Sequence, residues 1–147
     1  IELMQKLTPQ TNALWGSMDA QQMIEHLLNS AEVSTGKVIV EITTPADKIE
    51  KVKNVGLMSL RPFQREVKNA MLPAEPLPYK FENLQQSIAL LKQELEQLKE
   101  LYKNNTTYTQ ASNVFGALNY EEWMWFHYKH TYHHLSQFGI VPLVERL

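Results

Sequence analysis

The chain has 147 residues, of which 44% are hydrophobic and 20% are charged, and its formal net charge is −2 at pH 7. This length fits one domain spanning residues 1–147, and no apolar run approaches the roughly 18 residues that cross a bilayer, which excludes an integral membrane protein. The charge gives no reason to expect a nucleic acid partner, while the lack of cysteine excludes disulfides and thiolate metal ligands and fits a cytoplasmic protein.

The first residues, IELMQKL, have the apolar spacing of a helix that Pro9 limits. They lack the apolar core and cleavage site of a signal peptide, and we interpret them as the tail of a helix whose start is missing before Ile1. A loop then leads to a second predicted helix. Asp19 is its expected N-cap, Gln22 completes a capping box, and Gly36 offers a stop.

Residues 37–80 form the ambiguous part of the chain. The run VIVEI at residues 38–42 has strand composition but no partner strand nearby, so we predict an extended connector. Pro45 and Asp47 mark a helix start, which predicts a helix from about residue 45 to the upper fifties. The prolines between residues 73 and 78 then predict an extended crossover.

Two longer helices complete the predicted fold. Residues 81–105 place apolar side chains on one face, which indicates core packing rather than a coiled-coil partner site. The members of this stripe are Leu84, Ile88, Leu91, Leu95, Leu98 and Tyr102. Asn119 and Glu122 make a capping signature for a last helix that ends at Gly139. Four principal helices and no convincing sheet predict an all-α four-helix bundle with a long, partly extended crossover.

Four of the five histidines lie between residues 127 and 134, on the last predicted helix. At about 100° per residue, His130 and His134 are about 40° apart and share one face, whereas His133 points about 60° to the other side of His130. A histidine pair at i, i+4 can present two ring nitrogens to one metal ion at about 2.0 to 2.1 Å. His127, one turn earlier, is a less favoured substitute.

A third metal ligand must come from another part of the chain, and His26 is the remaining histidine. Its neighbours Met23 and Leu27 suggest an inward helix face, so His26 can join the pair if the two helices pack together. Three neutral imidazoles leave positions for water or substrate, as in catalytic zinc sites. The alternative is that the histidines are ordinary polar tips of an aromatic-rich helix, hydrogen-bonded to tyrosines, Gln137 and water.

Two segments carry a distinctive set of motifs. Residues 14–30, LWGSMDAQQMIEHLLNS, contain W-G-x-M and Q-M-x-x-H, and residues 114–139 contain F-G-x-L-x-x-E-E-W and H-x-x-H-H-x-x-Q-F-G. As a set they resemble the DinB-like metal-binding four-helix-bundle superfamily, close to a bacterial branch of unknown function. The middle of the chain matches only as helix and connector.

The resemblance implies a divalent metal, often nickel or zinc, held by His26, His130 and His134, the three residues that helix geometry also favours. It implies a metal-dependent hydrolase or thiol S-transferase in which the metal activates water or a low-molecular-weight thiol for a small-molecule substrate. A homodimer is compatible with it. The competing hypotheses are a non-catalytic helical binding protein, which keeps the pocket without turnover, and a structural or oligomerisation module.

Further residues of the matching segments have separate interpretations. We interpret Trp15 as packing, Gly16 as turn geometry, and Gln137 as a contact that orients a metal ligand or lies in the binding pocket. Relatives in this branch often have a His-Pro pair where this chain has Ser112 and Asn113. If that histidine binds substrate, the activity of this chain differs or is absent.

No second catalytic group stands out in the sequence. Glu25 projects about 100° away from His26, and Glu122 lies two turns before His130, so either would be a remote general base. Glu122 is better explained as a helix cap. No G-x-S-x-G motif and no glycine-rich phosphate loop is present.

Overall fold

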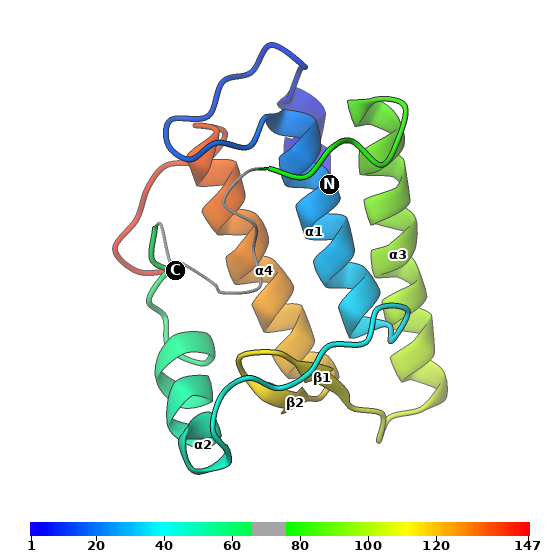
Figure 1. The fold of residues 1–147 in the computed structure, drawn as a ribbon, viewed down its shortest axis with the longest axis vertical. Helices are drawn as coiled ribbons and strands as arrows, with labels where there is room; N and C mark the ends of the chain where they lie inside the picture. Colours follow the sequence, from blue (N-terminus) through cyan, green and yellow to red (C-terminus); the bar gives the residue numbers. More distant parts are fainter. Residues whose placement is uncertain (66–75) are drawn as a thin grey trace.

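The structure is a computed structural model that describes residues 1–65 and 76–147. Its long helices are α1 (Ala20–Ser34), α3 (Leu84–Asn104) and α4 (Tyr120–Gln137). They run side by side, with α1 between α3 and α4 (Figure 1). The described residues are mostly helical, which agrees with the predicted all-α class. Within these two ranges, no helix is both long and apolar enough to cross a membrane.

Helix α1 begins at the predicted N-cap. The Asp19 carboxylate accepts a hydrogen bond from the Gln22 amide at 2.9 Å, and the Asp19 amide donates to Gln22 Oε1 at 3.0 Å. This capping box is confirmed, and it satisfies amide groups that the first helical turn leaves without partners. Beyond the C-cap Thr35, Gly36 has a φ of +78°, the left-handed conformation that commonly ends a helix.

Helices α3 and α4 also begin at side-chain caps. The Asn83 side chain accepts a hydrogen bond from the Gln86 amide at 2.9 Å, and the predicted box of Asn119 with Glu122 is present at the start of α4. Gly139 follows α4 with a φ of +68°. The apolar stripe predicted along α3 packs inward, with Leu95 partly buried and its other members buried: Leu84, Ile88, Leu91, Leu98 and Tyr102.

Among the described residues between α1 and α3, the helical ones lie between Ala46 and Leu57. A 3-10 turn (Ala46–Lys48), helix α2 (Ile49–Val52) and a π-helical turn (Lys53–Leu57) follow one another, which confirms the helix predicted from about residue 45. Residues 38–44 form neither helix nor strand, in agreement with the predicted connector. The predicted crossover lies partly outside the described residues, and its described end, residues 76–79, has no regular structure.

A short antiparallel hairpin corrects the prediction that the chain has no sheet. Strand β1 (Gln110–Ser112) pairs with β2 (Gly116–Leu118), so that Gln110 lies opposite Leu118. Strands of three residues are too short to show an alternating apolar pattern, so they could not be predicted from the sequence. The hairpin leads directly into the Asn119 cap and therefore fixes where α4 begins.

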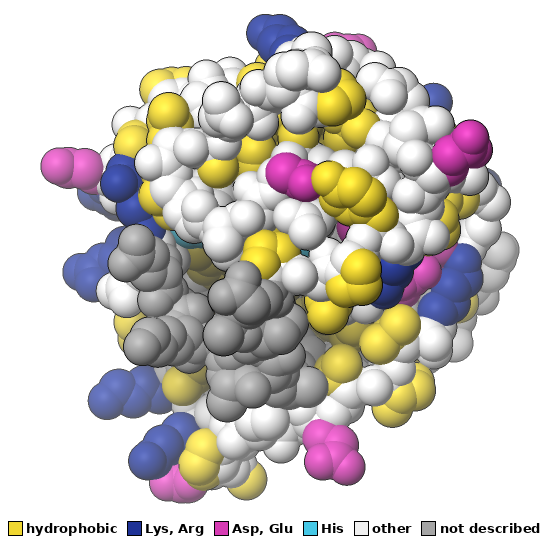
Figure 2. All heavy atoms as spheres, turned by 45° about the horizontal axis from the view of Figure 1, so that its top comes forward, with side chains coloured by type: hydrophobic (Ala, Val, Ile, Leu, Met, Phe, Trp, Pro, Cys, Tyr) yellow, Lys and Arg dark blue, Asp and Glu magenta, His cyan; other side chains and the backbone are white. Residues whose placement is uncertain are grey.

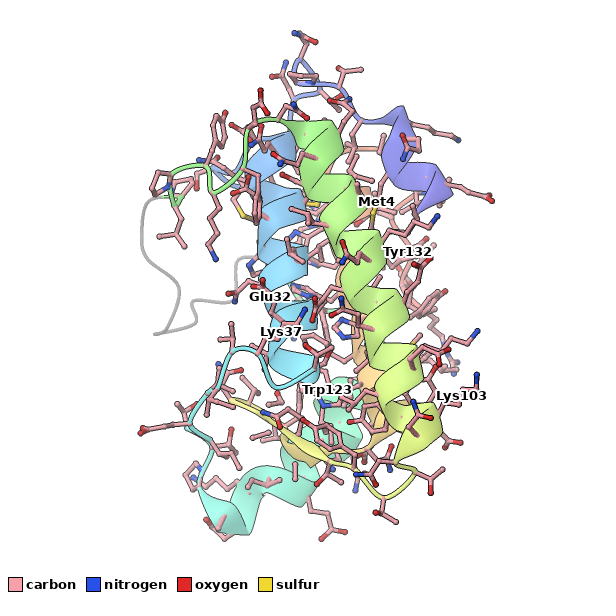
Figure 3. The ribbon with its side chains drawn as sticks, turned by 90° about the vertical axis from the view of Figure 1, so that its right-hand side faces the viewer. Met4, Glu32, Lys37, Lys103, Trp123 and Tyr132 are labelled. Atoms are coloured by element: carbon pink, nitrogen blue, oxygen red, sulfur yellow. The ribbon has the colours of Figure 1, made fainter. Side chains whose placement is uncertain are left out.

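Two apolar clusters support the helices at their two ends. The first contains Met4, from a 3-10 helix over Glu2–Lys6, together with inward residues of α1, α3 and the end of α4. The second, next to the hairpin, contains Trp123 and Leu98. Met4 and Trp123 lie towards opposite ends of the helices (Figure 3). The central turns of α1 and α4, which carry histidines, are thus held from both ends.

Candidate metal centre

The structure brings together the three histidines that were predicted as metal ligands from the sequence. His26 projects from the middle of α1, and His130 and His134 project from consecutive turns of α4. Nε2 of His130 lies 2.9 Å from Nε2 of His26 and 3.0 Å from Nε2 of His134. All three ligand atoms lie within 4.8 Å of one another, so the trio could hold a metal ion.

The separations between these nitrogens fit a shared cation. At metal–nitrogen bonds of about 2.1 Å, two ligand atoms are about 3.0 Å apart for a right angle at the metal and about 3.4 Å apart for a tetrahedral angle. Hydrogen bonding explains the arrangement less well. A neutral ring nitrogen carries one proton or one lone pair, so His130 Nε2 cannot form two good hydrogen bonds at once.

A hydrogen bond from His134 to Gln137 sets the tautomer of His134. Gln137 Oε1 lies 2.8 Å from His134 Nδ1, and Gln137 Nε2 donates to the carbonyl oxygen of Trp15 at 2.7 Å. Because the amide oxygen can only accept, Nδ1 of His134 carries the proton and Nε2 keeps the lone pair that a metal requires. Gln137 therefore orients a candidate ligand, as one of its two predicted roles requires.

The turn before α1 leaves room for this glutamine. Gly16 has a φ of +80°, and a Cβ atom at this position would lie 2.5 Å from Gln137 Nε2. Both the backbone conformation and the close approach therefore favour glycine. The Trp15 ring is partly buried and packs edge-on against His133 at 6.2 Å between centroids. Its side chain packs, as predicted, while its carbonyl group positions Gln137.

His130 is held by packing. Its ring lies 5.1 Å from the Phe126 ring and 6.3 Å from the Phe63 ring, measured between centroids. Its Nδ1 is buried and has no hydrogen-bond partner among the described residues. An imidazolium would need partners for both N–H groups, so these surroundings favour the neutral ring, the form that ligates metals.

Burial keeps all three rings uncharged at neutral pH. It lowers the pKa of His26 to about 4 and that of His134 to about 3, with smaller contributions from neighbouring histidines. The pKa of His130 is also lowered well below its ordinary value, first by burial and then by His134 and His26. Near pH 7 each ring is therefore neutral and keeps a lone pair on one of its two nitrogens, as a metal ligand requires.

The other two histidines of α4 lie outside the cluster. His127 is buried against the Trp123 ring, and its Nε2 lies 2.9 Å from Ser34 Oγ. Ser34 Oγ donates in turn to the Ala31 carbonyl at 2.7 Å, so it accepts from the imidazole. His133 is partly buried, with Nδ1 3.2 Å from the Phe63 carbonyl oxygen. Neither joins the trio, in agreement with the helix geometry.

The two carboxylates considered as general bases have other partners. Glu25 accepts hydrogen bonds from the backbone amides of Lys80 and Phe81 and from the side chains of Gln21 and Ser87. It thereby fastens the described end of the crossover to α1 and α3. Glu122 caps α4, as predicted, and pairs with Lys53 at 2.9 Å. Neither carboxylate is free to take a proton from a substrate.

A cavity of about 1310 Å³ opens beside the trio, and all three histidines contribute to its wall. Much of the remaining wall is apolar and comes from the helical segment 46–57, the hairpin region and α4. Ser112 and Asn113, where relatives often have His-Pro, also line the cavity. Most of this wall could not be predicted from the sequence, because its residues come from separate segments that only the fold brings together. The apolar members include Val33, Val40, Val52, Val55, Phe63, Phe115, Trp123 and Phe126.

A buried lysine that was not predicted from the sequence fixes one side of this cavity. Lys129 on α4 is fully buried, and its Nζ donates to the carbonyl oxygens of Gly56, Leu57 and Ser59 at 2.7 to 3.0 Å. Nζ also lies 5.0 Å from the centroid of the Phe63 ring. Burial lowers the pKa of Lys129 to about 8. The lysine therefore fastens the end of the segment 46–57 to α4.

Comparison with known proteins adds no assignment. No family model, curated protein or solved structure matches the chain. The resemblance to the DinB-like superfamily therefore stays a prediction that depends on the motifs around His26 and His134. The geometry of the three histidines stands independently of that resemblance, since it follows from how α1 packs against α4.

Proposed function

We propose that this chain binds one divalent metal ion, nickel or zinc, through His26, His130 and His134, and that it acts as a metal-dependent hydrolase or thiol S-transferase with a DinB-like bundle. The main support is the approach of three ring nitrogens to 2.9 and 3.0 Å from helices far apart in sequence. Imidazole is a suitable ligand for both metals. The chemistry that such an ion supplies is Lewis acidity, which lowers the pKa of a coordinated water or thiol and polarises a substrate oxygen.

The protein's own groups would prepare the site for that chemistry. Gln137 holds the proton on Nδ1 of His134 and so keeps Nε2 available. Phe63 and Phe126 pack around His130 and limit the access of water to its ring. The cavity gives a small-molecule substrate or thiol a route to all three histidines. Three protein ligands are the usual number where a metal keeps a position for substrate.

Metal analysis of purified protein tests this proposal. We expect about one nickel or zinc ion per chain in the wild type and a large loss after His134→Ala, because that change removes one of three ligands. His133→Ala is the matched control, since His133 is adjacent and lines the same cavity but contacts the Phe63 carbonyl group instead. Equal metal content in both variants would contradict the ligand assignment. X-ray absorption edges would identify the ion.

A binding protein without turnover is the second candidate, and one observation favours it. Both carboxylates that could serve as general bases, Glu25 and Glu122, are already hydrogen-bonded or ion-paired to groups of the protein. Assays of metal-loaded protein against thiol acceptors and against simple esters and amides separate the two candidates. Turnover that His134→Ala abolishes supports an enzyme, and full metal occupancy without turnover supports the binding protein.

A further inference from the structure

We propose that the cavity beside the three histidines takes a small anionic amphiphile. Its apolar body would lie against the apolar wall, and its acidic group would lie at a cationic rim, defined as Lys48, Lys51, Arg61 and Lys80. This inference rests on the proposed function for its link to metal chemistry, because it names the class of molecule that would reach the site. The rim itself can be tested without any metal.

The charges that line the cavity favour an anion. Four cationic side chains form the rim, and among the described lining residues Glu25 is the one carboxylate. Glu25 is buried, and its oxygens already accept hydrogen bonds from Lys80, Phe81, Gln21 and Ser87. Its oxygens therefore already have partners within the protein, and its one carboxylate is outnumbered by the four rim cations. The described part of the lining is thus net positive, opposite in sign to the whole chain, whose formal charge is −2.

The rim cations are also available for a ligand. All four are exposed, and none of them forms an ion pair within residues 1–65 and 76–147. Other lysines of the chain do pair, such as Lys37 with Glu94 and Lys53 with Glu122. A ligand carboxylate, sulfonate or phosphate would thus gain partners without breaking an existing pair among these residues.

The helical segment 46–57 separates its charges by face. Lys48, Lys51, Val52 and Val55 follow the spacing i, i+3, i+4 and i+7, which places them on one helix face, and all four line the cavity. The acidic residues of the same segment, Asp47 and Glu50, do not line it. The face towards the cavity is therefore basic and apolar together, the combination that suits an amphiphile rather than a uniformly polar anion.

The size of the site favours a soluble small molecule over a membrane surface. A volume of about 1310 Å³ is enough for one medium-sized ligand, and the histidines at its wall are buried or partly buried. Figure 2 shows Lys and Arg side chains projecting along one edge of the molecule, next to hydrophobic surface. A ligand with an apolar body and an acidic group could contact the apolar surface and the basic side chains at the same time.

Isothermal titration with three matched probes tests the inference: decanoate, decanol and decyltrimethylammonium, each below its micellar concentration. We expect decanoate to bind about tenfold more tightly than decanol, because the rim cations attract its carboxylate and find no charge on decanol. The cationic probe should bind least, because the same side chains repel it. Lys48→Glu/Lys51→Glu should weaken decanoate about tenfold and leave decanol unchanged, which would also show that the cavity is intact. Equal affinity for decanoate and decanol would overturn the proposal.

The matched control is Lys99→Glu/Lys103→Glu, which makes the same change of charge on α3. Lys103 points away from the helices (Figure 3), and neither lysine lines the cavity. Decanoate should bind this variant as it binds the wild type. An equal loss in both double variants would mean that net charge, and not the rim, controls binding, and the proposal would fail.

A metal-free arm separates this inference from the proposed function. In the presence of a chelator, decanoate should still bind His134→Ala more tightly than it binds His134→Ala that also carries Lys48→Glu/Lys51→Glu. If decanoate affinity follows the metal and ignores Lys48 and Lys51, the carboxylate binds the ion and the rim proposal is wrong. If neither the wild type nor any variant binds metal, but decanoate still binds more tightly when Lys48 and Lys51 are present, the proposed function is wrong and the rim proposal stands. Co-sedimentation with phosphatidylglycerol vesicles that depends on the same lysines would overturn the small-molecule assignment.

Discussion

Two histidine sites lie one turn apart on α4 and differ in what surrounds them. His127 and His130 are both buried, and burial lowers the pKa of each below its ordinary value. His127 has one hydroxyl partner, Ser34 Oγ, and its ring stacks on Trp123. His130 instead has two other ring nitrogens at 2.9 and 3.0 Å from its Nε2.

The difference shows that burial and a lowered pKa do not by themselves identify a metal ligand. At His127 the partner is a hydroxyl group that accepts a hydrogen bond from the ring N–H, so the pair is satisfied within the protein. At His130 the neighbours are further imidazoles, each offering a lone pair when neutral, and such a set becomes favourable when a cation lies between them. The identity of the partner atom distinguishes the two sites.

Removing His26 should cause the largest loss of metal affinity and so separate the two histidine sites most clearly. His26→Ala leaves both α4 histidines in place but removes the ligand that α1 supplies, so we expect at least a 100-fold loss of metal affinity, beyond the roughly 10- to 100-fold cost of losing an outer partner. His127→Gln should bind metal as the wild type does. Metal titration with a competing chelator gives both affinities. Similar losses in the two variants would remove the distinction between the sites.

Gln137→Leu should weaken metal binding by about 10- to 100-fold, since it frees His134 to change tautomer and orientation. Gly16→Ala acts on the same contact from the other side, because a Cβ there would lie 2.5 Å from Gln137 Nε2. Both variants should keep the three ligands and therefore lose less affinity than His26→Ala. Affinities as low as that of His26→Ala would mean that Gln137 supports the fold rather than one ligand.

Features encoded within one turn of helix could be predicted from the sequence. The capping boxes at Asp19 and Asn119 need partners only three residues away, and both are present. The pairing of His130 with His134 follows from helical periodicity in the same way. His26 was selected as the remaining histidine, and its contact with them depends on the packing of α1 against α4.

Features that depend on distant backbone groups could not be predicted. In the sequence, nothing distinguishes Lys129 from an ordinary surface lysine. Its partners are the backbone carbonyl groups of residues 56, 57 and 59, which no side-chain pattern reveals. Glu25 was considered as a base, whereas its partners come from residues 80, 81 and 87 after folding. The contribution of residues 46–57 to the cavity wall also depends on the fold, which sets this segment beside the histidines of α1 and α4.

The pH dependence of stability should sharpen the comparison at His127. Burial lowers its folded pKa from 6.5 to about 4, so the unfolded chain binds the proton more readily and stability falls as the pH drops from 6.5 towards 4. At pH 5 this one group should cost about 2 kcal/mol relative to pH 8. His127→Gln should lose that much less stability on acidification, as measured by urea unfolding at each pH with a chelator present. Parallel pH profiles for the two proteins would show that His127 is not buried as described.

Ser34→Ala should have the smallest effect, and one confined to stability. It removes the hydroxyl partner of His127 Nε2 and should lower the free energy of unfolding by about 1 kcal/mol, while the imidazole still titrates and the acid sensitivity remains. His127→Leu/Ser34→Ala removes both partners, so the double variant should be more stable than the sum of the two single changes predicts. Metal affinity should match the wild type in Ser34→Ala, in His127→Leu and in the double variant, because Ser34 and His127 lie outside the three-histidine cluster. A Ser34→Ala variant that loses metal would show that the two histidine sites are coupled and not independent neighbours on one helix.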